Sequence, residues 1–209
     1  MTGSLALDES QLRAGMRVVL AVSGGADSVA LLRRMVQRAP ELGSVISVLH
    51  VHHGIRGQAA DEDAAFVEAL AVRFRLPFHL HKVDTPAYAA KHRETLEEAA
   101  RNQRYAFFRE WMEQGSAEAV LTAHTLDDQA ETVLMKLLRG AWTEGLSGIH
   151  PVLSFPRGEV LRPLLGVRRT EIESWLRQLG QSWREDATNA DITFTRNRIR
   201  HELLPELSS

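Results

Sequence analysis

A short stretch of the chain combines glycines, hydroxyls and a carboxylate in a way that suits phosphate chemistry. It reads SGGADS from Ser23 to Ser28, follows an apolar run that ends at Val22, and precedes a helical pattern. Glycines let a backbone approach a ligand closely, and the free N–H groups at the start of a helix favour anions. Ser23, Gly24, Gly25 and Ser28 are therefore predicted to bind the phosphates of a nucleotide.

This loop lacks the lysine of the common phosphate-binding motifs and carries Asp27 instead. A carboxylate repels phosphates unless a cation lies between them, so the loop predicts a Mg²⁺ ion near Asp27. The alternative is an ordinary glycine turn in which Asp27 caps the following helix.

A second polar cluster reads AHTLDDQAET from residue 123 to 132. His124, Asp128 and Glu131 are spaced to line one side of the first helical turns. The helix dipole alone would accommodate adjacent carboxylates at this position. Together with the first loop, however, the cluster indicates metal-bridged phosphate chemistry, with Asp27 and Asp128 as the predicted metal ligands. For His124, phosphate stabilisation and proton transfer both stay open.

Histidines gather in the segment LHVHHGIRG, residues 49 to 57. A zinc site is one interpretation, but alternation along a strand sends His50 and His52 to one face and His53 to the other. The favoured interpretation is a strand end that contacts a nucleotide, with His52 and Arg56 among the binding residues.

Arginines could supply the fixed positive charge that the loop lacks. Arg101 and Arg104 follow a capping-box pattern, and the segment TRNRIRH places Arg196, Arg198 and Arg200 within five residues. In a helix, Arg196 and Arg200 would share a face, with Arg198 on the opposite one. Arginine suits bidentate phosphate contact and base stacking, so these residues are predicted to meet RNA or a triphosphate. A solvated helix face is the alternative.

Strand-like and helical patterns alternate along the part of the chain that carries these clusters. Strands are predicted at 17–22, 45–51, 78–83 and 119–122, and helices at 27–38, 59–74, 95–114 and 125–139. This order predicts an α/β fold with a doubly wound, mostly parallel sheet and helices on both faces. Ligands in such sheets lie at the carboxyl ends of the strands, where the polar clusters fall.

The pattern changes after Gly140. A hairpin is predicted at 151–164, an amphipathic helix at 170–179 and a basic helical segment at 196–204 that Pro205 ends. We therefore expect residues 1–145 to form a nucleotide-binding domain and residues 146–209 to form a small C-terminal α/β extension of the same catalytic unit.

Composition limits the class of protein. The 209 residues are 44% hydrophobic and 25% charged, as in an ordinary globular protein, and the net charge of −2 gives no overall basic signature. The absence of cysteine excludes disulfides, thiolate metal sites and cysteine nucleophiles. Apolar runs are far shorter than the roughly 20 residues of a membrane span, so we expect no membrane partner and a cytoplasmic location.

Taken together, these motifs resemble the PP-loop ATP pyrophosphatases, whose loop reads SGGxDS, and within that superfamily the tRNA(Ile)-lysidine synthetases. The resemblance rests on AVSGGADS, VHHGIRG, LEEAARNQRY, AHTLDDQAET and a tail that runs from RPLL to RNRIRHELLP. These segments follow one another in the expected order and cover nearly the whole chain.

The resemblance implies an enzyme that uses ATP and Mg²⁺ to adenylate the C2 oxygen of the wobble cytidine in tRNA(Ile). Free lysine then attacks C2, and AMP leaves. The residues implied are Asp27, His124, Asp128 and Arg101 for catalysis, Ser23, Gly24, Gly25, Asp27, Ser28, His52 and Arg56 for the cofactor, and Arg104, Glu131, Arg196, Arg198 and Arg200 for substrates.

Two other classes stay open. A sibling PP-loop enzyme could act on tRNA or on a small molecule, although the tRNA thiolases rely on cysteines, which this sequence lacks. A regulatory nucleotide-binding module would need the loop but not the second polar cluster or the arginine tail. Members of the resembled family usually continue into further domains that grip the tRNA, which we expect this chain to lack, and formation of a homodimer is left open.

Overall fold

A six-stranded sheet forms the centre of the computed structural model, which describes residues 4–142, 145–185 and 195–207. Its strands are β1 (Arg17–Ala21), β2 (Val45–His52), β3 (Phe78–Lys82), β4 (Ala119–Leu121), β5 (Val152–Phe155) and β6 (Gly158–Leu161). The order across the sheet is β3-β2-β1-β4-β6-β5, and every pairing is parallel except that of the edge strand β5 with β6. The predicted α/β class with a mostly parallel sheet is therefore confirmed.

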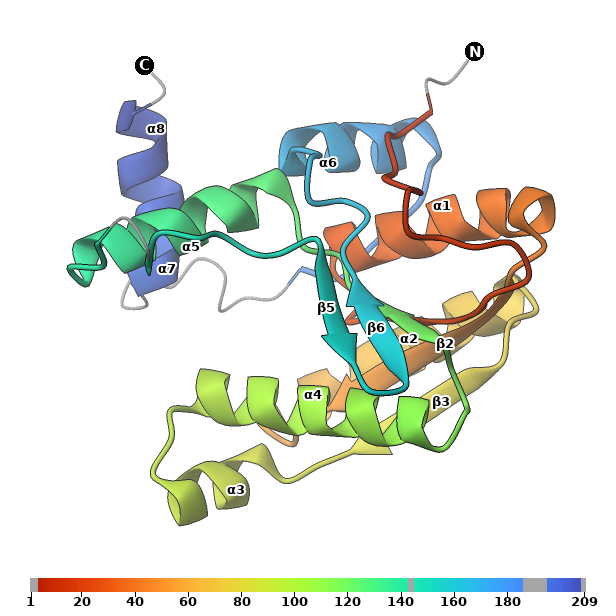
Figure 1. Cartoon of the computed structure of the whole chain (residues 1–209), viewed down its shortest axis with the longest axis horizontal. Helices are drawn as coiled ribbons and strands as arrows, with labels where there is room; N and C mark the ends of the chain where they lie inside the picture. The colour runs from red at the N-terminus through yellow and green to blue at the C-terminus, as the bar shows by residue number, and fades with distance from the viewer. Residues whose placement is uncertain (1–3, 143–144, 186–194, 208–209) are drawn as a thin grey trace.

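Helices cover both faces of this sheet. They are α1 (Ala26–Leu42), α2 (Gln58–Arg73), α3 (Thr85–His92), α4 (Leu96–Glu113), α5 (Leu126–Leu138), α6 (Arg169–Gln178), α7 (Thr195–Arg198), a π-helical turn (Ile199–Leu203) and α8 (Leu204–Leu207). Helices α1 and α6 lie on one side of the sheet, and α4 lies on the other with α3 against it (Figure 1). Among the described helices, none is both long and apolar enough to cross a membrane.

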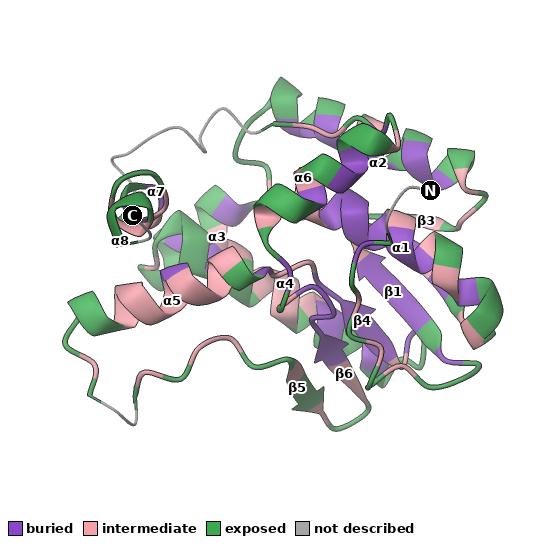
Figure 2. Cartoon of the chain, turned by 90° about the horizontal axis from the view of Figure 1, so that it is seen from above, coloured by how far each residue is buried: buried purple, intermediate pink, exposed green. Residues whose placement is uncertain are grey.

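Alternation along β1 separates two apolar cores. Val18 and Leu20 belong to the core under α1, α2 and α6, whereas Val19 packs in the core with Phe108 and Met112 of α4. The strand is thus buried on both faces, which explains why it reads as a continuous apolar run (Figure 2). Helix α5 differs from the other long helices, because its one buried residue is a glutamate, Glu131.

Several boundaries differ from the sequence prediction for local reasons. Helix α1 continues through Pro40, whose missing N–H costs one hydrogen bond in the last turn only, and ends at Gly43 with φ 62°. Helix α3 was not predicted, although the Asp84 side chain caps it by accepting the N–H of Ala87 at 2.9 Å. Pro205 lies in the first turn of α8, where proline is tolerated, rather than ending the helix.

The C-terminal segments share the central sheet and core. Strand β6 pairs with β4, so that Val160 lies opposite Val120, and the predicted hairpin thereby extends the main sheet. Ile172 and Trp175 of α6 belong to the same apolar cluster as Leu31 of α1. This packing brings the start of α6 to the carboxyl ends of the strands. The division at residue 145 stays a prediction.

Candidate active site

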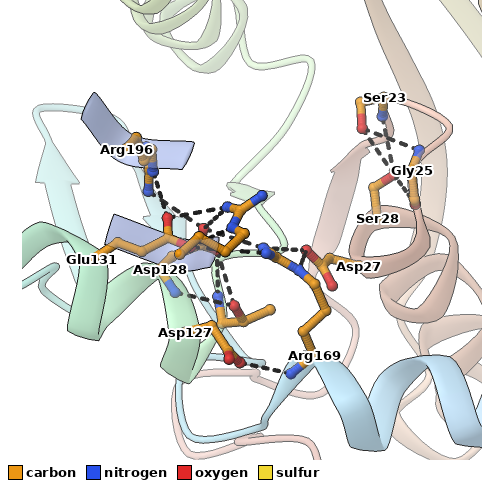
Figure 3. A network of polar contacts seen from close by, with 11 residues as sticks. Ser23, Gly25, Asp27, Ser28, Asp127, Asp128, Glu131, Arg169 and Arg196 are labelled. Atoms are coloured by element: carbon orange, nitrogen blue, oxygen red, sulfur yellow. Dashed lines mark hydrogen bonds and ion pairs between the residues drawn. The ribbon is translucent and has the colours of Figure 1, made fainter. Parts of the chain in front are cut away.

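The site lies where the chain leaves the two central strands. β1 and β4 are neighbours, and their onward connections lead to opposite halves of the sheet, to β2 and to β5. Such a switch point is the usual ligand-binding crevice of an open α/β sheet. The loop from Ser23 to Ser28 follows β1, and the segment that carries Asp128 follows β4 (Figure 3).

Ser28 shapes the loop after β1. Its Oγ donates to the carbonyl of Gly25 at 2.9 Å and accepts the N–H groups of Ser23 and Gly24, both at 3.2 Å. The Ser23 hydroxyl lies 3.2 Å from the same oxygen. These amides and hydroxyls are therefore engaged within the loop, and the N–H groups of the first turn of α1 are the donors that an anion would meet.

The two loop glycines have different roles. Gly24 has φ 101°, whereas Gly25 has φ −69° and ψ 162°, a conformation open to any residue. The backbone conformation therefore requires a glycine at position 24 but not at position 25. A Cβ on Gly25 would meet only the Ser23 Oγ, at 3.6 Å, so this position offers room for a close ligand.

We expect Gly24→Ala and Gly25→Ala to separate stability from binding. Gly24→Ala should lower the free energy of unfolding by about 1–2 kcal/mol, because the positive φ penalises a Cβ. Gly25→Ala should leave stability nearly unchanged but weaken ATP binding, because the methyl group fills the phosphate approach. Urea denaturation and calorimetric titration with ATP measure the two effects. Equal ATP affinity in Gly25→Ala and wild type would contradict the assignment.

Asp27 lies in the first turn of α1 but does not cap it. The cap position is Gly25, and no side chain makes the cap hydrogen bond. The Asp27 Oδ2 accepts from the Arg169 Nε at 3.1 Å and from its Nη2 at 3.0 Å. The other oxygen, Oδ1, is buried and has no hydrogen-bond partner among the described residues. Burial raises the pKa of Asp27 even though Arg169 opposes the shift.

The two carboxylate oxygens of Asp128 have different partners: one caps helix α5 and the other faces the arginines of the site. Oδ2 accepts the Thr125 N–H at 2.9 Å and the Thr125 hydroxyl at 3.1 Å, which completes a capping box at the start of α5. Oδ1 faces Arg169 Nη2 at 3.4 Å and Arg196 Nη2 at 3.3 Å. Burial works against the charged form, but Arg169, the Thr125 N–H and Arg196 outweigh it and lower the pKa of Asp128. The carboxylate that completes the cap of α5 is thus the same one that is predicted to bind the metal ion.

Glu131 anchors the arginine-rich C-terminal helix. It is fully buried, and its carboxylate accepts from Arg196 Nε at 2.6 Å and from Arg200 Nε at 2.6 Å. Arg196 and Arg200 therefore share one face, as the helical spacing predicts. Arg198 is exposed, and its Nε lies 3.6 Å from the carboxylate of Glu202. The structure thus separates Arg198 from the other two predicted substrate residues.

Arg169 is the central residue that the sequence prediction missed. It begins α6, and its backbone N–H donates to Asp127 Oδ2 at 2.7 Å, while its guanidinium lies between Asp27 and Asp128 (Figure 3). One local signal could have indicated it: a cation in the first turn of a helix opposes the helix dipole. Such a local conflict marks a residue that is placed for another purpose.

His124 and Arg104 stand beside this network. The His124 Nδ1 lies 3.0 Å from the Thr122 hydroxyl, and burial lowers the pKa of His124 to about 4, so the imidazole is neutral near neutral pH. Burial also lowers the pKa of Arg104, whose guanidinium makes no hydrogen bond within the described part of the chain. Arg101 is exposed, with its guanidinium 4.9 Å from the centre of the Tyr105 ring, and thus stands apart from the carboxylates.

The histidines at the end of β2 have separate partners. His50 is buried, with its Nδ1 2.8 Å from the carbonyl of Val22, and the Nδ1 of His53 lies 3.1 Å from the Thr85 hydroxyl. The His52 Nδ1 accepts the N–H of Gly54 at 3.3 Å. Nowhere in the described ranges do three or more His, Cys, Asp or Glu residues form a group that could hold a metal ion. The zinc interpretation therefore has no structural support.

Arg56 is linked to the phosphate loop through Asp63. Its Nη2 donates to Asp63 Oδ2 at 2.7 Å, and Asp63 Oδ1 accepts from Arg184 Nε at 2.9 Å. The backbone N–H of Arg184 in turn donates to the carbonyl of Gly24 at 2.9 Å. The buried Asp63 carboxylate thus joins the strand end after β2 to the loop after β1.

The fold and the loop together define a nucleotide-binding α/β domain built on a strand, an SGGxDS turn and a helix. The chain belongs to the family of ATP-binding PP-loop domains, whose model matches residues 5–207. The match includes both polar clusters and the arginine-rich tail.

Several curated relatives of this chain are named tRNA(Ile)-lysidine synthase. The protein of Solibacter usitatus is 47% identical over 196 residues, which cover 93% of this chain and 42% of that protein. The protein of Geobacter sulfurreducens is 47% identical over 200 residues, with 96% and 42% covered. The protein of Deinococcus radiodurans is 47% identical over 194 residues, which cover 92% of this chain and 31% of that protein. The chain thus spans less than half the length of these relatives.

Solved structures share the fold at low sequence identity. The U34-tRNA thiolase NcsA from Methanococcus maripaludis superposes with a TM-score of 0.70 at 18% identity, covering 86% of this chain and 62% of that one. The NH3-dependent NAD synthetase from Campylobacter jejuni gives 0.52 at 16% identity, with 94% and 81% covered. At these identities the likeness supports the architecture alone.

Proposed function

We propose that this chain is the catalytic domain of a tRNA(Ile)-lysidine synthase, which ligates lysine to the wobble cytidine of tRNA(Ile) at the expense of ATP. The relatives of that name are 47% identical over 92–96% of this chain. The observation that carries the proposal is the meeting of two sequence-distant carboxylates, Asp27 and Asp128, on one guanidinium beside the phosphate loop. A regulatory module has no need of this arrangement.

Asp27 and Asp128 fit a Mg²⁺ ion. The buried Oδ1 of Asp27 has no partner among the described residues, and the lowered pKa of Asp128 keeps that carboxylate charged. Magnesium favours one or two carboxylates together with substrate phosphates, which agrees with a site of only two acidic ligands. When bound, the ion supplies charge neutralisation at the phosphates of ATP.

The remaining groups would bind and orient the substrates. The first turn of α1 offers N–H donors and a positive dipole end to the phosphates. The Arg104 guanidinium, with no hydrogen bond within the described part of the chain, is available to an anion. These fixed charges replace the lysine that other phosphate loops carry.

His124 presents a neutral imidazole to the substrates. The C–N bond to C2 forms as the bond from C2 to the adenylated oxygen breaks and AMP leaves, and the attacking amine must lose a proton. Burial lowers the pKa of His124 to about 4, so the imidazole is neutral near pH 7 but is a weak base, which suits hydrogen bonding to a phosphate or to the amine better than removal of that proton. Positioning the amine and the adenylated base supplies most of the remaining catalysis.

The partners in this proposal are tRNA(Ile) with a cytidine in the wobble position and free lysine, and the location is the cytoplasm. Formation of a homodimer stays a prediction. The contacts that Arg196, Arg198 and Arg200 make with tRNA, ATP or lysine belong to the same proposal. Of these, Arg198 is the most exposed to a macromolecular partner.

A direct assay tests the proposal. The 209-residue chain is incubated with a tRNA(Ile) transcript, ATP, Mg²⁺ and labelled lysine. We expect AMP and acid-precipitable label to form together, and a transcript with uridine at the wobble position to give neither. AMP formation without lysine incorporation would favour another PP-loop enzyme acting on tRNA. Absence of both products would contradict the proposal for this chain.

A further inference from the structure

The guanidinium of Arg169 lies where a cation between the two carboxylates would lie. Its Nε and Nη2 contact the Asp27 Oδ2 at 3.1 and 3.0 Å, and Nη2 also lies 3.4 Å from the Asp128 Oδ1. Its Nη1 is 3.9 Å from the carboxylate of Glu131 (Figure 3). One side chain thus bridges the loop after β1 and the helix after β4.

This side chain is not needed to dock α6. The backbone N–H of Arg169 already donates to Asp127 Oδ2, and the Leu126 N–H donates to the carbonyl of Val167 at 2.9 Å. Ile172 and Trp175 bury the apolar face of the same helix. The arginine is also in the first turn, where the helix dipole opposes a positive charge. Its placement therefore serves the carboxylates rather than the helix.

A metal ion at both carboxylates would need an oxygen of Asp128 that Arg169 contacts. Asp128 Oδ2 is engaged in the capping box, so Oδ1 is the oxygen of Asp128 that faces the site, and Arg169 and Arg196 both contact it. Asp27 keeps only Oδ1 without a partner in the described chain. A divalent ion bridging the two residues would lie beside a guanidinium, and like charges at contact distance repel each other.

We propose that Arg169 is a resident counter-cation that competes with the divalent metal for Asp27 and Asp128. This inference rests on the proposed metal role of these two residues. Arg169 neutralises two buried carboxylates that would otherwise repel each other in the nucleotide-free protein. The metal therefore binds weakly alone and tightly with ATP, because the nucleotide phosphates offer the displaced guanidinium a new anionic partner. Metal and nucleotide enter the site together.

Binding of Mn²⁺ in the absence of nucleotide tests the competition. Free Mn²⁺ is measured by electron paramagnetic resonance in titrations of wild type and of Arg169→Gln. We expect Arg169→Gln to bind Mn²⁺ about tenfold more tightly than wild type, which corresponds to about 1.4 kcal/mol. With ATP present, the wild type should gain more Mn²⁺ affinity than the variant does. A damaged fold would not produce tighter binding.

Arg177→Gln provides the matched control on the same helix. Arg177 is exposed, its Nη2 lies 2.7 Å from the Glu173 carboxylate at i,i+4, and its guanidinium lies 5.6 Å from the centre of the Trp183 ring. Its loss should therefore leave Mn²⁺ affinity unchanged. The double variant Asp27→Asn with Arg169→Gln should lose the gain. Where Arg169→Gln fails to fold by circular dichroism, Arg169→Lys should show a smaller gain in the same direction, because a single ammonium cannot reach both carboxylates as a guanidinium does.

Thermal unfolding gives a second readout. In EDTA, Arg169→Gln should melt below wild type, and Mg²⁺ should raise its melting temperature by more than it raises that of wild type. Suppose that wild type binds Mn²⁺ through Asp27 when ATP is present. Equal Mn²⁺ affinity of Arg169→Gln and wild type without nucleotide would then overturn this inference. Absence of Asp27-dependent Mn²⁺ binding in every protein, with or without ATP, would instead overturn the proposed metal role.

Discussion

The Asp27→Asn variant is expected to form AMP from ATP and tRNA at about one-thousandth of the wild-type rate, a loss of about 4 kcal/mol of transition-state stabilisation. The substitution keeps the shape of the side chain but removes its charge. It thereby removes the oxygen of Asp27 that is buried without a partner among the described residues, and the carboxylate that Arg169 contacts. Single-turnover formation of AMP from labelled ATP measures the effect.

Asp127→Asn is the matched control for this experiment. Asp127 is next to Asp128 at the start of α5, but within the described ranges its Oδ2 accepts the backbone N–H of Arg169, which an amide oxygen can accept equally well. We expect AMP formation within a few fold of wild type. Wild-type AMP formation by Asp27→Asn would remove Asp27 from the chemistry and with it the proposed metal site.

The main elements of the fold could be predicted because their signals are local. The predicted capping box Thr95–Glu98 forms, the helix predicted at 125–139 begins with a cap at Thr125, and β1 is recognisable as a strand buried on both faces. Helix α3 carries comparable signals, an N-cap aspartate and Pro86 in the first turn, but it is only eight residues long. About two helical turns are too few for an apolar periodicity to be detected.

The site was only partly predictable because its decisive contacts are distant in sequence. Asp27 and Arg169 are separated by 142 residues, and no local sequence pattern around either residue indicates that the two pair. Glu131 was predicted as a residue that meets substrate, whereas its carboxylate is occupied by Arg196 and Arg200. Motif spacing identifies which residues carry charge, but only the packing of α6 and α7 on the sheet decides which charges pair.

These pairings explain how a phosphate loop can work without its own lysine. Three arginines, from α6, α7 and the π-helical turn, meet the carboxylates of Asp27, Asp128 and Glu131, so the fixed positive charge comes from elements that follow the loop by more than 100 residues.

The Glu131→Gln variant is expected to lose about 2–3 kcal/mol of unfolding free energy. Glu131 is fully buried and receives hydrogen bonds of 2.6 Å from both Arg196 and Arg200. Removing its charge leaves two guanidiniums without their main partner, which costs several kcal/mol when a pair is buried. The arginine side chains keep 31% and 22% of their exposure, so solvent lowers the penalty.

Urea denaturation near pH 7 measures this loss, and Glu202→Gln serves as the control. Glu202 is exposed and lies 3.6 Å from Arg198 as an i,i+4 pair, so its substitution should change stability by less than about 0.5 kcal/mol. Because α7 and the π-helical turn contact α5, Glu131→Gln should also speed proteolytic cleavage between residues 195 and 207. Equal stability and equal cleavage in Glu131→Gln and wild type would show that apolar contacts, rather than this carboxylate, hold the arginine-rich helix over the site.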